Sequence, residues 1–92
     1  MCDIYASTDP SLYQMVARSV RIGGVVTSLR LERQFWNILE GVAAASAMTL
    51  AQFLTRLHDE VIERQGETGN FASLLRVVCV VHLEHRLRPE AP

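Results

Sequence analysis

The sequence predicts a mainly α-helical domain that opens with one β-strand and completes its sheet with a second copy of the chain. Three features predict this fold class: a short alternating segment at residues 25–31, two later segments with helical spacing of apolar residues, and a helix-length segment rich in valine. A length of 92 residues corresponds to one domain. Such a chain buries only about 60–65% of its unfolded surface, and association of two copies is a common way to stabilise it.

Residues 25–31 have the composition of a strand, with β-branched residues at the start and alternation of apolar and polar residues towards the end. The alternation places two sets of residues on opposite faces: Thr27, Leu29 and Leu31 on one, and Val26, Ser28 and Arg30 on the other. A lone strand would leave its backbone N–H and C=O groups unpaired. We therefore expect it to pair with the same strand of a second copy.

Two amphipathic helices are expected next. From Glu32 to about Ser46 the apolar residues recur at helical spacing, and Thr49 is a favourable N-cap for the second helix. Residues 71–87 are expected to form a third helix because the segment is longer than most strands, although its valines at 77–81 would also suit a buried strand. A helix with valines on most of its faces is usually buried on most of them, which indicates contacts beyond a minimal dimer.

The remaining organisation follows from composition. We assign residues 1–17 to an N-terminal arm, residues 18–87 to the folded domain and residues 88–92 to a tail. No signal peptide is recognised, Cys2 and Cys79 have no paired spacing, and the longest apolar run is far too short to cross a bilayer. These observations predict a cytoplasmic protein without a membrane partner.

The charge is nearly balanced, with nine arginines, ten acidic residues and a formal net charge of -1. A nucleic-acid footprint would therefore have to be local. His82 and His85 are too few for a metal site, and no Gly-rich phosphate loop or catalytic group is recognised. We expect no metal, no cofactor and no enzymatic activity. Trp36 is expected in the core or at a dimer interface, and Cys79 as a buried apolar residue.

Several short segments carry a family resemblance through their order and spacing: Arg18-Ser19-Val20-Arg21-Ile22, Thr27-Ser28, Leu31-Glu32, Phe35-Trp36, Met48-Thr49-Leu50 and Asn70-Phe71-Ala72-Ser73-Leu74-Leu75-Arg76-Val77. Together they resemble the ribbon-helix-helix family of DNA-binding proteins, in a small bacterial subgroup with an added C-terminal helix. The resemblance implies an intertwined homodimer, in which an intermolecular antiparallel β-ribbon enters the major groove of double-stranded DNA and regulates transcription.

The resemblance also implies roles for particular residues. The residues expected to contact bases are Val26, Ser28 and Arg30. Phosphate contacts are expected from Thr49 and the amides of Leu50 and Ala51. They are also expected from Arg18 and Arg21, which share a side if their segment is extended or loosely wound. Arg33 is a weaker candidate for a phosphate contact.

Two positions depart from the family pattern. Val26 stands where the outer strand face usually starts with a basic or polar residue, and it can touch only a thymine methyl group. Ala47 stands where the turn before the second helix often has a left-handed glycine, so that this turn is either strained by about 1 kcal/mol or built differently.

Two other functions remain open. The first is an assembly or protein-interaction module on the same scaffold, with dimers associating through residues 71–81 into tetramers or larger bodies. The near-neutral charge, Val25-Val26 and the apolar third helix motivate it. The second is an antitoxin that represses its own promoter and blocks a toxin, although the apolar C-terminal part is unlike the usual polar antitoxin tail.

Overall fold

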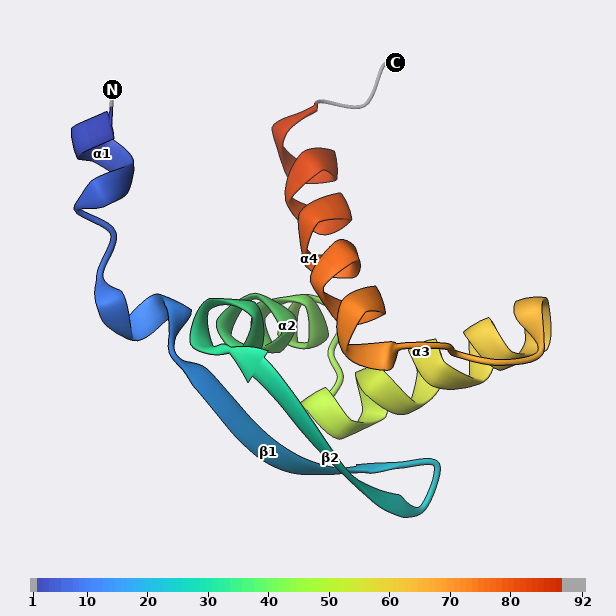
Figure 1. Ribbon diagram of the computed structural model, residues 1–92. Helices are drawn as coiled ribbons and strands as arrows, with labels where there is room; N and C mark the ends of the chain where they lie inside the picture. Colours follow the sequence, from blue (N-terminus) through green and yellow to red (C-terminus); the bar gives the residue numbers. More distant parts are fainter. Residues whose placement is uncertain (1, 89–92) are drawn as a thin grey trace.

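The computed structural model describes residues 2–88, and its elements follow one another as a hairpin and a set of helices (Figure 1). In chain order they are α1 (Cys2–Ala6), the 3-10 helix η1 (Pro10–Tyr13), β1 (Met15–Ile22), β2 (Val25–Glu32), α2 (Arg33–Ala45), α3 (Leu50–Gln65) and α4 (Phe71–Leu87). The two strands form the sheet, and α2, α3 and α4 gather on one of its sides. The predicted strand, two helices and added C-terminal helix are confirmed.

The partner of β2 lies in the same chain. β1 and β2 are antiparallel, with Met15 opposite Glu32 and Ile22 opposite Val25. The two residues between them, Gly23 and Gly24, have φ of 60° and 84°. A two-residue hairpin turn of the I′ type needs positive φ at both positions, which glycine adopts without steric cost.

The prediction that the strand has no partner within its own chain is therefore wrong. Its backbone groups are satisfied by residues 15–22, and the strand β1 begins inside the segment 1–17 that was expected to be an arm. The physical reason is the glycine pair, which reverses the chain and brings a second alternating segment alongside the first.

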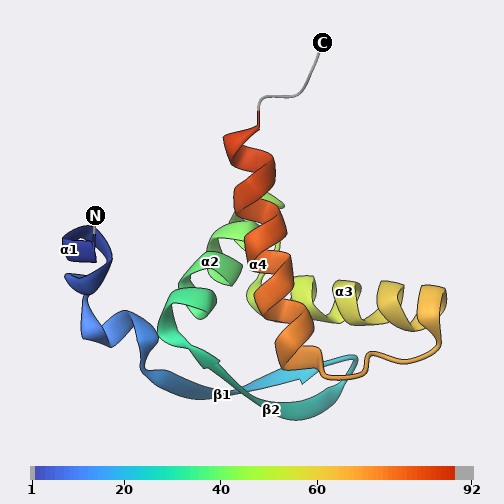
Figure 2. The same ribbon diagram turned by 45° about the horizontal axis from the view of Figure 1, so that its top comes forward.

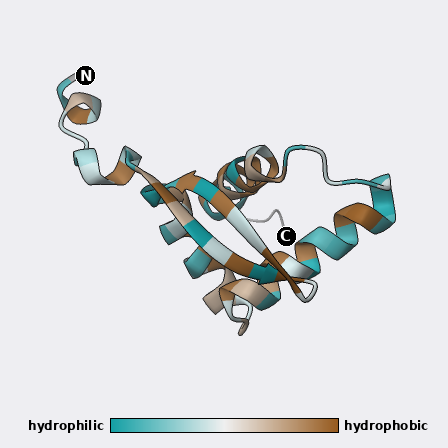
Figure 3. Cartoon of the chain, turned by 60° about the horizontal axis from the view of Figure 1, so that its bottom comes forward, coloured by the Kyte–Doolittle hydropathy of each residue, from teal (hydrophilic) through white to brown (hydrophobic). Residues whose placement is uncertain are grey.

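The core lies between the inner face of the hairpin and the three long helices. The buried apolar residues of the hairpin are Val20, Ile22, Leu29 and Leu31, and those of the helices are Trp36, Leu39, Ala43, Leu50, Leu54, Leu75 and Cys79. Alternate residues of each strand point into this core, as the two-residue period of a strand requires. No helix among residues 2–88 covers the opposite face of the hairpin (Figure 3).

The turn between α2 and α3 contains a left-handed residue, the first of the two alternatives for Ala47. Ala47 has φ of 57°, the N–H of Ala47 donates to the carbonyl of Ala44 at 3.0 Å, and the N–H of Met48 donates to that of Ala43 at 2.9 Å. This is the Schellman arrangement that closes many helices, and its left-handed position is usually glycine. Here alanine adopts that conformation.

Replacing Ala47 with glycine should raise the free energy of unfolding by about 0.5–1 kcal/mol, because the strain of a left-handed Cβ outweighs the added freedom of the unfolded chain. Urea unfolding followed by circular dichroism would measure the change. Ala44→Gly is the matched control: Ala44 is helical and exposed, so this glycine should destabilise the protein. Equal losses in both variants would contradict the strain at Ala47.

The helix α4 packs against α2 through one side only and rises away from the hairpin (Figure 2). Asn70 caps it, since its Oδ1 accepts a hydrogen bond from the N–H of Ser73 at 3.1 Å. Leu75 and Cys79 are buried, whereas Val77 is 58% and Val80 is 50% exposed. The expected helix is confirmed. The sequence also predicted that most faces of this helix would be buried, but within the described chain only the side with Leu75 and Cys79 is covered.

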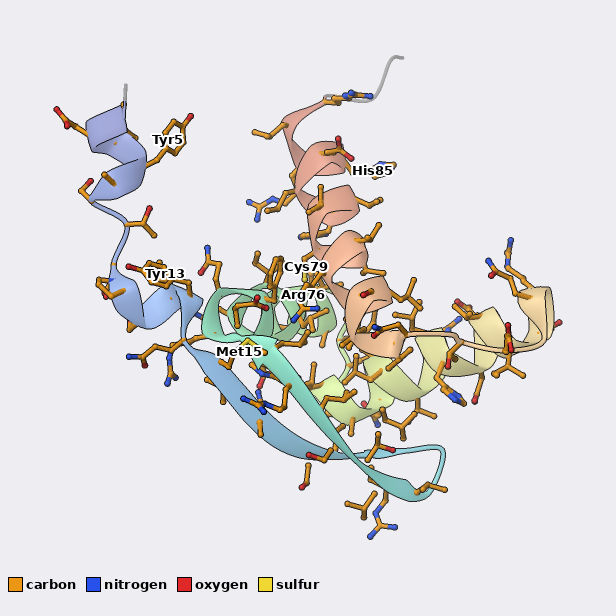
Figure 4. All side chains as sticks on the ribbon, in the orientation of Figure 1. Tyr5, Tyr13, Met15, Arg76, Cys79 and His85 are labelled. Atoms are coloured by element: carbon orange, nitrogen blue, oxygen red, sulfur yellow. The ribbon has the colours of Figure 1, made fainter. Side chains whose placement is uncertain are left out.

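An ion pair joins α4 to the junction of β2 and α2. The Nε of Arg76 donates to the Oε1 of Glu32 at 2.9 Å, with both side chains about two-thirds covered, at 33% and 30% exposure. Figure 4 shows Arg76 and Cys79 on the part of α4 that approaches α2. A hydrogen bond from the backbone N–H of Glu32, and then the one from Arg76, lower the pKa of the Glu32 carboxyl below its ordinary value of 4.5.

This lowered pKa predicts an acid-dependent loss of stability. A carboxyl with a lower pKa in the folded state stabilises the fold above its unfolded pKa, and the stabilisation disappears as the pH falls through the folded pKa. Glu32→Gln should therefore reduce stability at pH 7 and make its decline below about pH 5 shallower. Urea unfolding at a series of pH values would measure both changes, with Glu67→Gln, in an exposed loop, as the control.

Within the described residues, no single helix is both long enough and apolar enough to cross a membrane. Only α2 and α3 taken together have the length and apolar composition that a membrane span needs, and the two helices are bent by 89° at the break between them.

Candidate nucleic-acid interface

The outer face of the hairpin is an exposed, mostly polar surface contributed by both strands. Six exposed residues form its central part: Ala17, Ser19 and Arg21 from β1, and Val26, Ser28 and Arg30 from β2. The register places them as three cross-strand pairs: Ala17 with Arg30, Ser19 with Ser28, and Arg21 with Val26. The three candidate base-contacting residues of β2 therefore share one solvent-facing side, as expected from their alternation.

The residues of β1 on this face were not among the expected base-contacting residues. Ala17 and Ser19 were assigned no role, and Arg21 was expected only at a phosphate. The alternation that marks this strand is visible in the sequence, since Ser19 and Arg21 alternate with the buried Val20 and Ile22. From the sequence, residues 18–22 were expected to be either extended or loosely wound, and no strand was predicted there.

Arg18 lies on the opposite side of the hairpin from Arg21. Its Nη1 is 3.2 Å from the Oε2 of Glu40, and its guanidinium carbon is 5.0 Å from the centre of the Trp36 ring. The two arginines are three residues apart in a strand, where residues an odd number apart point to opposite faces. The expectation that they share a side is therefore wrong, and Arg18 is engaged by contacts within the chain.

The N-terminus of α3 is closed by a capping box. The Oγ1 of Thr49 accepts from the N–H of Gln52 at 3.1 Å, and the Oε1 of Gln52 accepts from the N–H of Thr49 at 2.9 Å. The predicted N-cap is confirmed. The N–H groups of Leu50 and Ala51 belong to the first helical turn, where no carbonyl of the helix can accept from them, and the helix dipole favours an anion there.

Two hydrogen bonds attach α3 to the turn of the hairpin. The N–H of Gly23 donates to the Oγ1 of Thr55 at 3.1 Å, and that hydroxyl donates to the carbonyl of Arg21 at 3.4 Å. The first turns of α3 are thereby held at a fixed position relative to the ribbon. An anion bound at the N-terminus of α3 would therefore lie at a fixed distance from a ligand bound on the outer face of the hairpin.

Acidic residues border one side of this region. A groove between the hairpin turn and α3 is lined by Arg21 and Arg56 together with Asp59, Glu60 and Glu63. The carboxylates belong to the later turns of α3 and would repel a phosphate backbone. Approach of DNA is therefore favoured over the hairpin and the first turn of α3, and disfavoured along the rest of that helix.

Other residues singled out in the sequence are two core residues, Trp36 and Cys79, and the exposed His85 and Arg33. Trp36 is buried and its Nε1 donates to the carbonyl of Val16 at 2.9 Å, which confirms a core role. Cys79 is fully buried, and burial raises the pKa of its thiol to about 11. No group of three potential metal ligands occurs among residues 2–88, and Figure 4 shows His85 near the outer end of α4. Arg33 is exposed in the first turn of α2.

A β-hairpin with a polar outer face, followed by two helices and a capped helix start, is the architecture of a β-ribbon DNA-binding domain. A model of the ribbon-helix-helix domain matches residues 15–83, from β1 into α4. The chain belongs to the ribbon-helix-helix domain family. Members of this family are typically DNA-binding transcription regulators that dimerise, and they are typically not enzymes.

A solved structure is similar over nearly the whole chain. It is that of an uncharacterized protein from Bordetella pertussis Tohama I, with a TM-score of 0.90 and 41% sequence identity. The similarity covers 95% of this chain and 70% of that protein. No curated protein matches the chain.

Proposed function

We propose that this protein binds double-stranded DNA sequence-specifically in the bacterial cytoplasm and regulates transcription. The observation that carries the proposal is the outer face of the hairpin, where two arginines and two serines are exposed on a ribbon whose other face is built into the core. The major groove of B-DNA is about 12 Å wide and accommodates a two-stranded ribbon. Side chains on such a ribbon would meet the edges of the bases.

The residues on this surface take distinct roles in the proposal. Arg30 donates two hydrogen bonds to O6 and N7 of a guanine, Ser28 donates to or accepts from a neighbouring base, and Val26 contacts a thymine methyl group. Thr49 and the amides of Leu50 and Ala51 bind a backbone phosphate, which sets the register of the ribbon on the duplex. Thr49 keeps its cap to Gln52, so the two following amides are the principal donors.

Among the arginines expected at phosphates, Arg21 is exposed on the outer face, and its Nη1 donates a hydrogen bond to the carbonyl of Gly24. Arg18 would have to give up both the Glu40 carboxylate and the Trp36 ring to reach DNA. We therefore assign Arg18 the weakest role of the proposed contacts.

Selection from a random duplex library with the purified protein at low salt tests this function. An enriched sequence is expected, and its affinity should fall steeply with salt, because each phosphate contact contributes about 0.9 to the slope of log affinity against log salt concentration. Failure to enrich any sequence would overturn the proposal. Arg64→Ala serves as a control, because Arg64 is exposed near the end of α3, in its last turn.

We also propose that two copies associate, through α4. Pairing of β2 with a second β2 would produce four adjacent strands, about 14 Å across before side chains are added, which is wider than the major groove. The exposed side of α4 is instead apolar, and its large residues there are Val77, Val80, Val81, Leu83 and Leu87. They lie away from the Leu75–Cys79 side that packs on the core.

The same exposed side of α4 favours a second candidate function, an oligomeric assembly module with weak or no DNA binding. Light scattering separates the two. A dimer that retains specific DNA supports the regulator, and a larger species without DNA binding supports the assembly module. The double variant Val77→Glu/Val81→Glu should dissociate either species, whereas Gln65→Glu, exposed at the end of α3, should not.

A further inference from the structure

The two strands of the hairpin repeat a similar pattern of residues. Residues 16–22 read Val-Ala-Arg-Ser-Val-Arg-Ile and residues 25–31 read Val-Val-Thr-Ser-Leu-Arg-Leu. At an offset of nine residues the identical pairs are Val16 with Val25, Ser19 with Ser28 and Arg21 with Arg30. Two further pairs exchange one aliphatic residue for another: Val20 with Leu29 and Ile22 with Leu31.

The register turns this repeat into a symmetry of the folded hairpin. Ser19 lies opposite Ser28, so an axis through that pair, perpendicular to the sheet, carries each residue of β1 onto the residue nine positions later in β2. The axis carries Arg21 onto Arg30 and Ala17 onto Val26. The inner face follows the same symmetry, because the aliphatic pairs of the repeat supply the buried residues of both strands.

Each strand therefore presents a small apolar residue, a serine and an arginine on the outer face. The two sets run in opposite directions because the strands are antiparallel. A ribbon built from two identical chains has such an axis because its strands are copies of each other. Here a single chain has the same arrangement, because both strands are its own and they repeat the same pattern.

We infer that the hairpin of one chain is a pseudo-two-fold reading surface, and that the DNA it recognises is itself a short inverted repeat. This inference rests on the proposed DNA binding. Arg21 and Arg30 would each contact a guanine, one in each half of the repeat and on opposite DNA strands. Ser19 and Ser28 would lie over its centre.

The geometry also sets the spacing of the two guanines. Ala17 lies opposite Arg30, and Ala17 and Arg21 are four residues apart in β1. Four residues of a strand extend about 13 Å, which corresponds to roughly four base-pair steps of about 3.4 Å. The symmetry is not complete, since the Nη1 of Arg21 donates to the carbonyl of Gly24 at 3.0 Å. Arg21 must release this carbonyl to contact a base, so its contribution should be the smaller one.

Library selection with the wild-type protein and with Arg21→Ala and Arg30→Ala tests this inference, together with the mass of the complex that the dissociated Val77→Glu/Val81→Glu variant forms on the selected site. The wild type should select an inverted repeat with guanines about four steps apart, bound by one hairpin. Each variant should lose the guanine of one half-site and about 5- to 150-fold in affinity, with the smaller loss for Arg21→Ala. Circular dichroism should show unchanged folding, since both side chains are exposed.

The alternative outcomes are distinct. Specific binding to a motif without two-fold symmetry, or a motif that Arg21→Ala leaves unchanged, overturns this inference and leaves the DNA-binding proposal standing. The same holds if the Val77→Glu/Val81→Glu variant, which should be monomeric, occupies one short repeat only as two chains. Absence of specific binding by the wild-type protein overturns the proposed function and this inference together.

Discussion

Replacing Arg30 with alanine should weaken binding to the preferred DNA site by about 1–3 kcal/mol, a factor of roughly 5 to 150. The guanidinium is exposed on the outer face of the hairpin, and the opposite residue is the small Ala17, which leaves room for a base edge. Alanine removes both hydrogen bonds to a guanine. Titration of labelled duplexes that carry each of the four bases at the contacted position would measure the loss of affinity and of preference.

Arg33→Ala is the matched control for Arg30. Arg33 is also exposed and lies three residues later, at the start of α2, beyond the ribbon. Loss of a phosphate contact weakens binding to all sequences about equally, whereas loss of a base contact changes which sequence is preferred. A uniform loss with Arg30→Ala, without any change in base preference, would show that Arg30 binds the backbone.

Replacing Trp36 with alanine should lower the free energy of unfolding by about 3–5 kcal/mol. The ring is 3% exposed, its Nε1 donates to the carbonyl of Val16 at 2.9 Å, and Arg18 lies over its face. The substitution leaves a large cavity between β1 and α2 and removes the hydrogen bond that the indole donates to Val16. Because domains of this size are stable by about 5–15 kcal/mol, much of that stability would be lost.

Urea unfolding followed by far-ultraviolet circular dichroism measures this effect without relying on tryptophan fluorescence. Trp36→Phe keeps most of the apolar volume and loses the hydrogen bond, so its loss should be about 1–2 kcal/mol. Arg30→Ala, a surface change, should stay within about 0.5 kcal/mol of the wild type. A Trp36→Ala variant as stable as Arg30→Ala would contradict the core role of the ring.

The elements with strong local signals were predictable. The alternation at residues 25–31 correctly placed Ser28 and Arg30 on the solvent-facing side, and Thr49 marks the start of a helix, as predicted. The left-handed position at Ala47 was recognised as an alternative from the family pattern, and the backbone adopts it. Each of these features depends on a side chain and its neighbours within one or two turns of the chain.

The partner of β2 required the tertiary structure. Backbone pairing depends on which segment can reach the strand, and a chain that turns at Gly23 and Gly24 brings its own β1 there before any second copy is needed. Strand pairing then decided that Arg18 faces Glu40 while Arg21 faces solvent. It also decided that the outer face has two strands from one chain.

The amino-acid sequence by itself determined α2, α3 and α4, the cap at Thr49 and the two-residue period of β2, because these follow from short-range sterics and hydrogen bonding. Only the tertiary structure decided what lies next to each face, because that depends on contacts between residues far apart in the chain. Trp36 is buried through its contact with Val16, twenty residues away, whereas Val77 stays exposed because no element of the described chain reaches its side of α4.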